Sequence, residues 1–124
     1  MAVLVDSDVL MEVSRGRNAE VFDQWRQLSE SDDPILCSPV TVAELWRGAR
    51  PTEFESLDKL LSVMICVPID RQVGRTAGDY LRKFARSHAL ELADAMIAAS
   101  AAIHGATLWT RNRRHYPMPE LRFL

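Results

Sequence analysis

Lysine, cysteine and long apolar segments are scarce in this chain of 124 residues. Lys59 and Lys83 are the only lysines among its 15 basic residues, so nearly all of the positive charge is arginine. The formal net charge of −2 argues against a protein that coats nucleic acid by bulk electrostatics, although it permits a local basic patch. The planar fork of arginine suits phosphate contacts, but genomic base composition explains the same bias equally well.

The two cysteines, Cys37 and Cys66, are far apart in sequence, and each lies within a short apolar run. Their spacing is not that of a metal site, so we expect buried, reduced thiols in a cytosolic protein. No apolar run is long enough for a membrane helix, and no signal peptide is apparent. With 48% apolar and 26% charged residues, the chain is expected to be one soluble globular domain over 1–124, located in the cytoplasm.

The stretch from Ala2 to Leu10, AVLVDSDVL, is the starting point for the fold. The apolar run from Ala2 to Val5 suits a strand covered on both faces, as in the middle of a parallel sheet. Asp6 ends this run, and Ser7 and Asp8 are residue types that start helices. A buried central strand therefore places a carboxylate at its C-terminal end, which is the edge where open α/β sheets bind ligands.

Strands and helices alternate along the rest of the chain. Ser38 followed by Pro39 is typical of a helix start, Asp70 is expected to cap a long helix, and Gly105 to end an alanine-rich one. This order predicts an α/β fold, with a central parallel sheet and helices on both faces. The expected strands are 2–5, 35–38, 63–67, 107–110 and an edge strand at 121–124; the main helices are 19–29, 39–49, 53–61, 70–86 and 92–104.

Four polar residues fall where such a sheet would gather them. Asp6 ends the first strand, and Glu44 lies in the first half of the helix after the second strand. Asp94 is in the first turn of the alanine-rich helix, and Asn112 follows the fourth strand. Three carboxylates crowded together repel one another unless a cation lies among them. Mg²⁺ and Mn²⁺ take oxygen ligands and need few carboxylates, and such a site activates water for attack on a phosphodiester.

These residues and Asp8 also have purely structural interpretations. Asp8 is best explained as a helix N-cap, and Asp94 as an acid favoured by the positive end of a helix dipole. Glu44 pairs with Thr41 as a capping box, but the Ser38–Pro39 start puts Glu44 too deep in its helix to cap it. Asn112 is a common residue type in polar turns. Of the four site candidates, Glu44 therefore calls most for a function.

Taken together, three groups of residues resemble the PIN-domain family. They are VDSDVL, VAELWRGA, and LADAMIAASA followed by HGATLWTRNRRHY, in this order and spacing. Within that family they are most similar to the VapC-type toxin ribonucleases of bacterial toxin–antitoxin pairs. The resemblance covers essentially the whole chain, its most specific part runs from Asp94 to His115, and it implies the PIN-like form of the three-layer fold.

The resemblance implies a role for each site candidate. Asp6, Glu44 and Asp94 match the acidic metal-binding residues of the family. Asn112 matches a fourth position that is aspartate in many PIN domains and asparagine in many VapC-like ones, so a second metal would be held weakly.

Two further positions lie beside this acidic cluster. Asp8 stands where the family more often has asparagine or serine, so its charge either adds an outer metal contact or only caps the helix. Thr110 matches a hydroxyl position beside the cluster.

The activity that the resemblance implies is Mg²⁺- or Mn²⁺-dependent endonucleolytic cleavage of structured RNA, often tRNA or ribosomal RNA. Family members are typically homodimers that a cognate VapB-type antitoxin holds inactive. For contacts with RNA we look to the loop beside Asn112, which is equally explained as a solvated turn. Its basic residues are Arg111, Arg113, Arg114 and His115.

Two other interpretations stay open. DSDVL also resembles the nucleophile motif of haloacid-dehalogenase-type phosphatases, but these need a lysine after a later strand, and both lysines fall in predicted helices. That interpretation also leaves Glu44 and Asp94 without a role. The second alternative is a non-catalytic PIN-like module that binds RNA or protein, since acids in place do not prove turnover.

Overall fold

The computed structural model describes all residues from Met1 to Leu124 and has a four-stranded parallel sheet at its centre. The strand order is β3-β2-β1-β4, so β1 lies inside the sheet and the chain winds first to one side of it and then to the other. Val3 of β1 pairs with Ile35 of β2 and with Thr107 of β4. The strands are β1 Val3–Val5, β2 Ile35–Cys37, β3 Ile65–Cys66 and β4 Thr107–Trp109.

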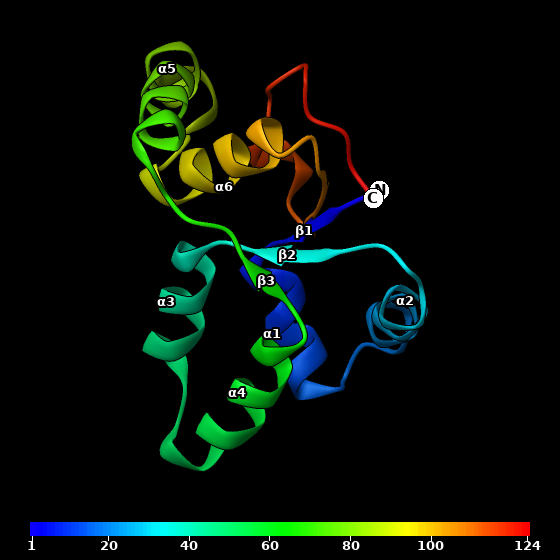
Figure 1. Cartoon of the computed structure of the whole chain (residues 1–124). Helices are drawn as coiled ribbons and strands as arrows, with labels where there is room; N and C mark the ends of the chain where they lie inside the picture. Colours follow the sequence, from blue (N-terminus) through cyan, green and yellow to red (C-terminus); the bar gives the residue numbers. More distant parts are fainter.

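Helices cover both faces of this sheet, which confirms the predicted α/β three-layer sandwich (Figure 1). One layer holds α1 Ser7–Arg15, α2 Ala19–Glu30, α3 Pro39–Gly48 and α4 Phe54–Ser62. The other holds α5 Arg71–His88 and α6 Leu92–Ile103, with α6 between α5 and the sheet. Two short 3₁₀ turns complete the chain, η1 Pro51–Glu53 and η2 Arg113–His115.

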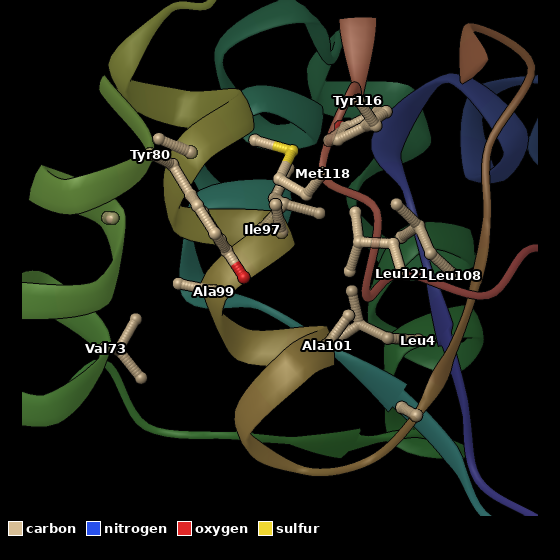
Figure 2. Packing of buried hydrophobic residues seen from close by; sticks show 14 of the residues in the cluster. Leu4, Val73, Tyr80, Ile97, Ala99, Ala101, Leu108, Tyr116, Met118 and Leu121 are labelled. Carbon is tan, nitrogen blue, oxygen red and sulfur yellow. The ribbon is translucent and has the colours of Figure 1, made fainter. Parts of the chain in front are cut away.

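Alternate residues of the central strand enter two separate cores, as the period of two in a strand requires. Val3 and Val5 pack with α1, α2 and Trp109, whereas Leu4 packs on the opposite face with α5 and α6. Figure 2 shows the second cluster, in which Leu4 and Leu108 of the sheet lie next to side chains of α6 and of the C-terminal segment. Because β1 is buried on both faces, side chains of both cores hold its C-terminal end in position.

The local helix signals of the sequence act as predicted. The Ser38 hydroxyl accepts the amide of Val40 at 3.1 Å, with Pro39 in the first turn of α3. The Asp70 carboxylate accepts the amide of Val73 at 3.0 Å at the start of α5. Gly105 follows α6 with φ +60°, a conformation that glycine adopts without strain.

Two expectations for the sheet edges were wrong. The segment 121–124 forms no strand; it contributes a single parallel bridge between Leu108 and Phe123. The third strand is Ile65–Cys66 rather than 63–67, and Ile65 is 58% exposed. Both segments lie at the outside of the sheet, where pairing on only one side lets a strand shorten.

The edge position of β3 also corrects one thiol prediction. Cys37 of β2 is buried, as expected, but Cys66 is exposed. The two residues are partners in the β2–β3 register, and both thiols are free. Separately, none of the helices combines the length and apolar character needed to cross a membrane.

The two thiols should therefore differ in reactivity. Burial, and then the neighbouring Cys66, raises the pKa of Cys37 to about 12, so this thiol is neutral at pH 8. A maleimide or disulfide reagent at pH 8 should modify one thiol per native chain, and the second only in denaturant. The Cys66→Ser variant should lose the native reaction and Cys37→Ser should keep it; equal rates for both thiols in the native protein would contradict this arrangement.

Candidate active site

Asp6 lies where the C-terminal end of β1 meets the first turn of α1. Its amide donates to the Trp109 carbonyl at 2.9 Å, which extends the β1–β4 pairing by one residue. Its carboxylate is only 6% exposed and caps α1, accepting the Ser7 amide at 2.8 Å. It also accepts the Thr110 hydroxyl at 2.9 Å and the Tyr116 hydroxyl at 2.7 Å. Asp6 is thus a buried carboxylate fixed by donors from three parts of the chain.

Glu44 reaches the same site from α3. The Ser7 hydroxyl donates to Glu44 Oε1 at 3.0 Å and lies 3.5 Å from Asp6 Oδ1, so this serine lies between the two carboxylates. α3 starts after the C-terminal end of β2, beside β1, which brings Glu44 to the edge where Asp6 lies. Glu44 is half-buried and has no hydrogen bond within α3, so its position in mid-helix is not a capping role.

Asp94 lies in the first turn of α6, as predicted. Its Oδ2 atom is 4.0 Å from Nδ1 of His115, which comes from η2. The charge of Asp6 acts on Asp94, and the charge of Asp94 acts on Glu44. The three acids that the sequence singled out are therefore neighbours at one edge of the sheet.

Asp8 does not cap α1, contrary to our expectation. Asp6 is the cap, and Asp8 lies inside the first turn with its carboxylate directed at the loop after β4. Its Oδ2 atom accepts the Arg111 amide at 3.0 Å and the Asn112 side-chain amide at 3.3 Å, with the Thr110 hydroxyl at 3.4 Å. Its Oδ1 atom is buried and has no hydrogen-bond partner. Asp8 thus holds the loop that carries Asn112, and it keeps one oxygen unsatisfied.

Three acids of this site, Asp8, Glu44 and Asp94, have pKa values above the ordinary range. Burial, followed by the charge of Asp6, raises the pKa of Asp8 to about 6. Burial also raises the pKa of Glu44 and of Asp94 above their ordinary values, and the charge of Asp6 adds to both shifts. Burial and the charge of Asp6 raise the pKa of Tyr116 as well, so its hydroxyl keeps its proton and remains a donor. Crowded like charges in a partly dry site have this effect, and a cation would reverse it for the carboxyls.

The donor chemistry of the site fits a hard divalent cation. Every acidic group offers oxygen, and the unsatisfied Oδ1 of Asp8 is an available acceptor. No three acidic, histidine or cysteine side chains converge closely enough to hold a metal ion by themselves. This fits an ion such as Mg²⁺, which keeps several waters and takes only one or two carboxylates directly. The predicted ligands Asp6, Glu44 and Asp94 stay a prediction.

The basic loop after β4 divides into two parts. Arg111 forms an ion pair with Glu12 of α1 at 3.1 Å, and Arg114 is exposed without an ion pair. Arg113 turns to the C-terminus instead: it donates to the Leu124 carbonyl at 2.7 Å and lies over the Phe123 ring. Of the three arginines expected to contact RNA, Arg111 and Arg113 each have a partner within the protein, and only Arg114 has none.

Sequence reasoning missed Ser7 and Tyr116 as parts of this site. Ser7 joins carboxylates 37 positions apart, and Tyr116 reaches Asp6 across 110 positions, so neither contact leaves a local pattern. One signal was available for Tyr116, because a buried tyrosine needs a partner for its hydroxyl. The only acceptor it finds is Asp6.

The fold and the site together define the class of this protein: it is a parallel α/β domain with an acidic site at the carboxyl edge of its sheet. The model of the PIN domain matches residues 3–121, and the chain belongs to this family.

Relatives in sequence and in structure agree with that assignment. "Ribonuclease VapC10" of Mycobacterium tuberculosis is 38% identical over 119 residues, which are 95% of this chain and 88% of the relative. "Ribonuclease VapC19" of the same organism is 29% identical over 121 residues, 96% of each chain. Among solved structures, VapBC2 of Rickettsia felis bound to a promoter DNA fragment superposes with a TM-score of 0.83 at 20% identity, covering 100% of this chain and 98% of that one. At that identity the likeness shows the fold.

The raised pKa of Asp8 predicts a pH effect on stability in the absence of divalent ions. A carboxyl whose pKa is higher in the folded state contributes stability that is present below the unfolded pKa and is lost as pH rises through the folded one. For Asp8 this window runs from 3.8 to about 6.

Asp8→Asn removes this titration. In EDTA, therefore, the free energy of unfolding of the variant should increase relative to that of the parent as the pH rises from 4 to 7. Urea unfolding at the two pH values measures the difference. Asp58→Asn, which removes one exposed charge from α4, is the control. If the free energies of unfolding of Asp8→Asn and the parent differ by the same amount at both pH values, the pKa of Asp8 is not raised in the folded state, and the account of Asp8 is wrong.

Proposed function

We propose that this protein is an endoribonuclease that depends on Mg²⁺ or Mn²⁺ and acts as the toxin of a VapBC-type toxin–antitoxin pair. The proposal is supported by relatives named as ribonucleases that align over nearly the whole chain. The observation that carries it is the acidic cluster: Asp6, Glu44 and Asp94 come from three different elements to one sheet edge, and burial raises the pKa of two of them. A fold maintained for packing alone has no need of such repulsion.

The metal would be held by Asp6, Glu44 and Asp94, one or two of them directly and the rest through waters of the ion, with Asn112 nearby and Asp8 as an outer contact through its free oxygen. When bound, such an ion activates water and stabilises the charge that develops on a phosphodiester. The chain's own residues do the rest. Thr110 and Tyr116 keep Asp6 in one orientation, and Ser7 sets its spacing from Glu44.

His115 and two arginines of the loop are the side chains that we propose contact the substrate. His115 is exposed and lies 4.0 Å from Asp94. Arg111 and Arg114 flank Asn112, and their side chains suit contacts with the RNA phosphates on either side of the reacting bond.

The alternatives are weaker. A phosphatase of the haloacid-dehalogenase type needs a lysine at the aspartate, but Lys59 pairs with Glu55 on α4 and Lys83 lies on the exposed face of α5. A module that only binds RNA has no need to crowd three acids. A measurement of turnover decides between the two: RNA binding without cleavage would favour the non-catalytic binding module.

Partners follow from the same proposal. A cognate VapB-type antitoxin would bind over the acidic site, and the active form would be a homodimer, as the resemblance implies. A cytoplasmic location is part of the proposal, since that is where the proposed RNA substrates of a bacterial toxin would be met. The RNA itself is a structured one such as tRNA or ribosomal RNA.

Cleavage by matched variants tests the proposal. With Mg²⁺ or Mn²⁺ and total bacterial tRNA or ribosomal RNA, the parent should produce discrete fragments that EDTA prevents. Glu44→Gln and Asp94→Asn, which keep the shape of each side chain, should lower the cleavage rate about 100-fold or more. Asp79→Asn, an exposed acid of α5 paired with Arg82, is the control and should cleave like the parent. Cleavage by Glu44→Gln and Asp94→Asn at the parent rate would rule out the proposed site.

A further inference from the structure

A second polar cavity lies away from the acidic cluster, at the far ends of α1 and α3. It has a volume of about 420 Å³ and no apolar lining. Arg15 ends α1, Arg17 follows it in the next turn, and Arg50 precedes η1. The remaining lining residues are Gly48, Thr52 and Glu53. We refer to Arg15, Arg17 and Arg50 as the arginine cluster.

The arginine cluster carries positive charge that the protein itself does not neutralise. Arg15, Arg17 and Arg50 are exposed, and none of them forms an ion pair. The one acid in the cavity, Glu53, uses its Oε1 atom to accept the backbone amide of Arg50 at 2.9 Å. Three guanidinium groups beside one carboxylate leave the cavity with net positive charge, which attracts anions. This cavity is therefore suited to an anionic ligand with several charges.

Helix geometry connects the arginine cluster with the acidic site. Ser7, which hydrogen-bonds Glu44, is followed on the same face of α1 by Met11 and then Arg15, at steps of four residues. On α3, Gly48 follows Glu44 at the same step. This face of α1 therefore runs from Ser7, beside the carboxylates, to Arg15 in the arginine cluster. At a rise of 1.5 Å per residue, the two residues are about 12 Å apart along the helix axis.

The space between these two ends is hollowed as well. A smaller cavity of about 50 Å³ lies between α1, α3 and α4, and it shares Arg15, Gly48 and Glu53 with the arginine cavity. Its other lining residues are Met11, Ser14, Leu45, Ala49 and Leu57. α1 and α3 are in contact along this line. This small cavity extends the arginine cavity by about one turn along α1 and α3, on the side that faces the acidic site.

We propose that the arginine cluster binds backbone phosphates of the substrate RNA, away from the bond that is cut. This inference rests on the proposed function and extends it to the path of the substrate. A strand stacked as in B-DNA rises about 3.4 Å per nucleotide, so 12 Å is spanned by at most about four nucleotides. RNA that runs from the acidic site along α1 would meet the arginines at that distance. The cluster then positions long substrates without reading their sequence.

Salt-dependent binding of RNA tests this role. Asp94→Asn serves as the non-cleaving background, with Mg²⁺ present, and a labelled single-stranded RNA of 20 nucleotides is the probe. In that background Arg15, Arg17 and Arg50 are replaced together by glutamine. The matched control replaces three exposed arginines of α5, Arg71, Arg75 and Arg86, so both variants lose the same net charge.

The cluster variant should bind the 20-nucleotide RNA at least tenfold more weakly than its background. The slope of log Kd against log salt should fall by about 2, since each single-stranded phosphate contact contributes about 0.7. A dinucleotide held at the acidic site is too short to reach the arginines, so it should bind the cluster variant and its background alike. The α5 control should bind the 20-nucleotide RNA within about twofold of the background, because its arginines attract RNA only from a distance.

Equal RNA binding by the cluster variant and the α5 control would overturn the inference while leaving the nuclease site intact; the cavity would then suit an acidic protein segment instead. Failure of the Asp94→Asn background to bind the RNA, together with failure of the parent to cleave any RNA, would overturn the proposed function and this inference with it.

Discussion

The structure depends on holding the charge of Asp6 at the end of a strand that is buried on both faces. Three groups donate to this carboxylate at 2.7–2.9 Å, the amide of Ser7 and the hydroxyls of Thr110 and Tyr116. Hydrogen bonds to charged groups each contribute about 1.5–3 kcal/mol, which offsets much of the cost of burial. Because Asp6 keeps its place, its charge acts on Asp8, Glu44 and Asp94, and their mutual repulsion is relieved by protonation or would be relieved by a bound cation.

Local patterns were enough to predict the framework that places Asp6. The apolar run before it, the Ser38–Pro39 helix start and the Asp70 cap depend on neighbouring residues, so they are visible in sequence. Long-range register is not. That Val5 pairs with Trp109 brings Thr110 to Asp6, and nothing near Thr110 indicates this. The same holds for Tyr116 and Ser7, for Asp8 turning to the loop after β4, and for Cys66, exposed because β3 is an edge strand.

The acidic site and the arginine cluster have opposite charges and lie at the two ends of α1. α1 joins them, since its first turn carries Asp8 and its last carries Arg15. An RNA backbone is attracted by the arginines and repelled by bare carboxylates, so a cation at the acidic end would let one substrate contact both. The net charge of −2 conceals this division, which explains why bulk composition gave no sign of nucleic-acid binding.

Thermal unfolding with and without Mn²⁺ tests the central claim, that these acids form a metal site, most directly, and it needs no knowledge of the substrate. A ligand that binds only the folded state stabilises it by RT ln(1 + [L]/Kd), about 2.7 kcal/mol at one hundred times Kd. The account predicts that Mn²⁺ raises the Tm of the parent and that Glu44→Gln and Asp94→Asn each lose most of that rise, while Asp79→Asn keeps it. A parent that does not respond to Mn²⁺, or a Glu44→Gln variant that responds like the parent, would contradict it.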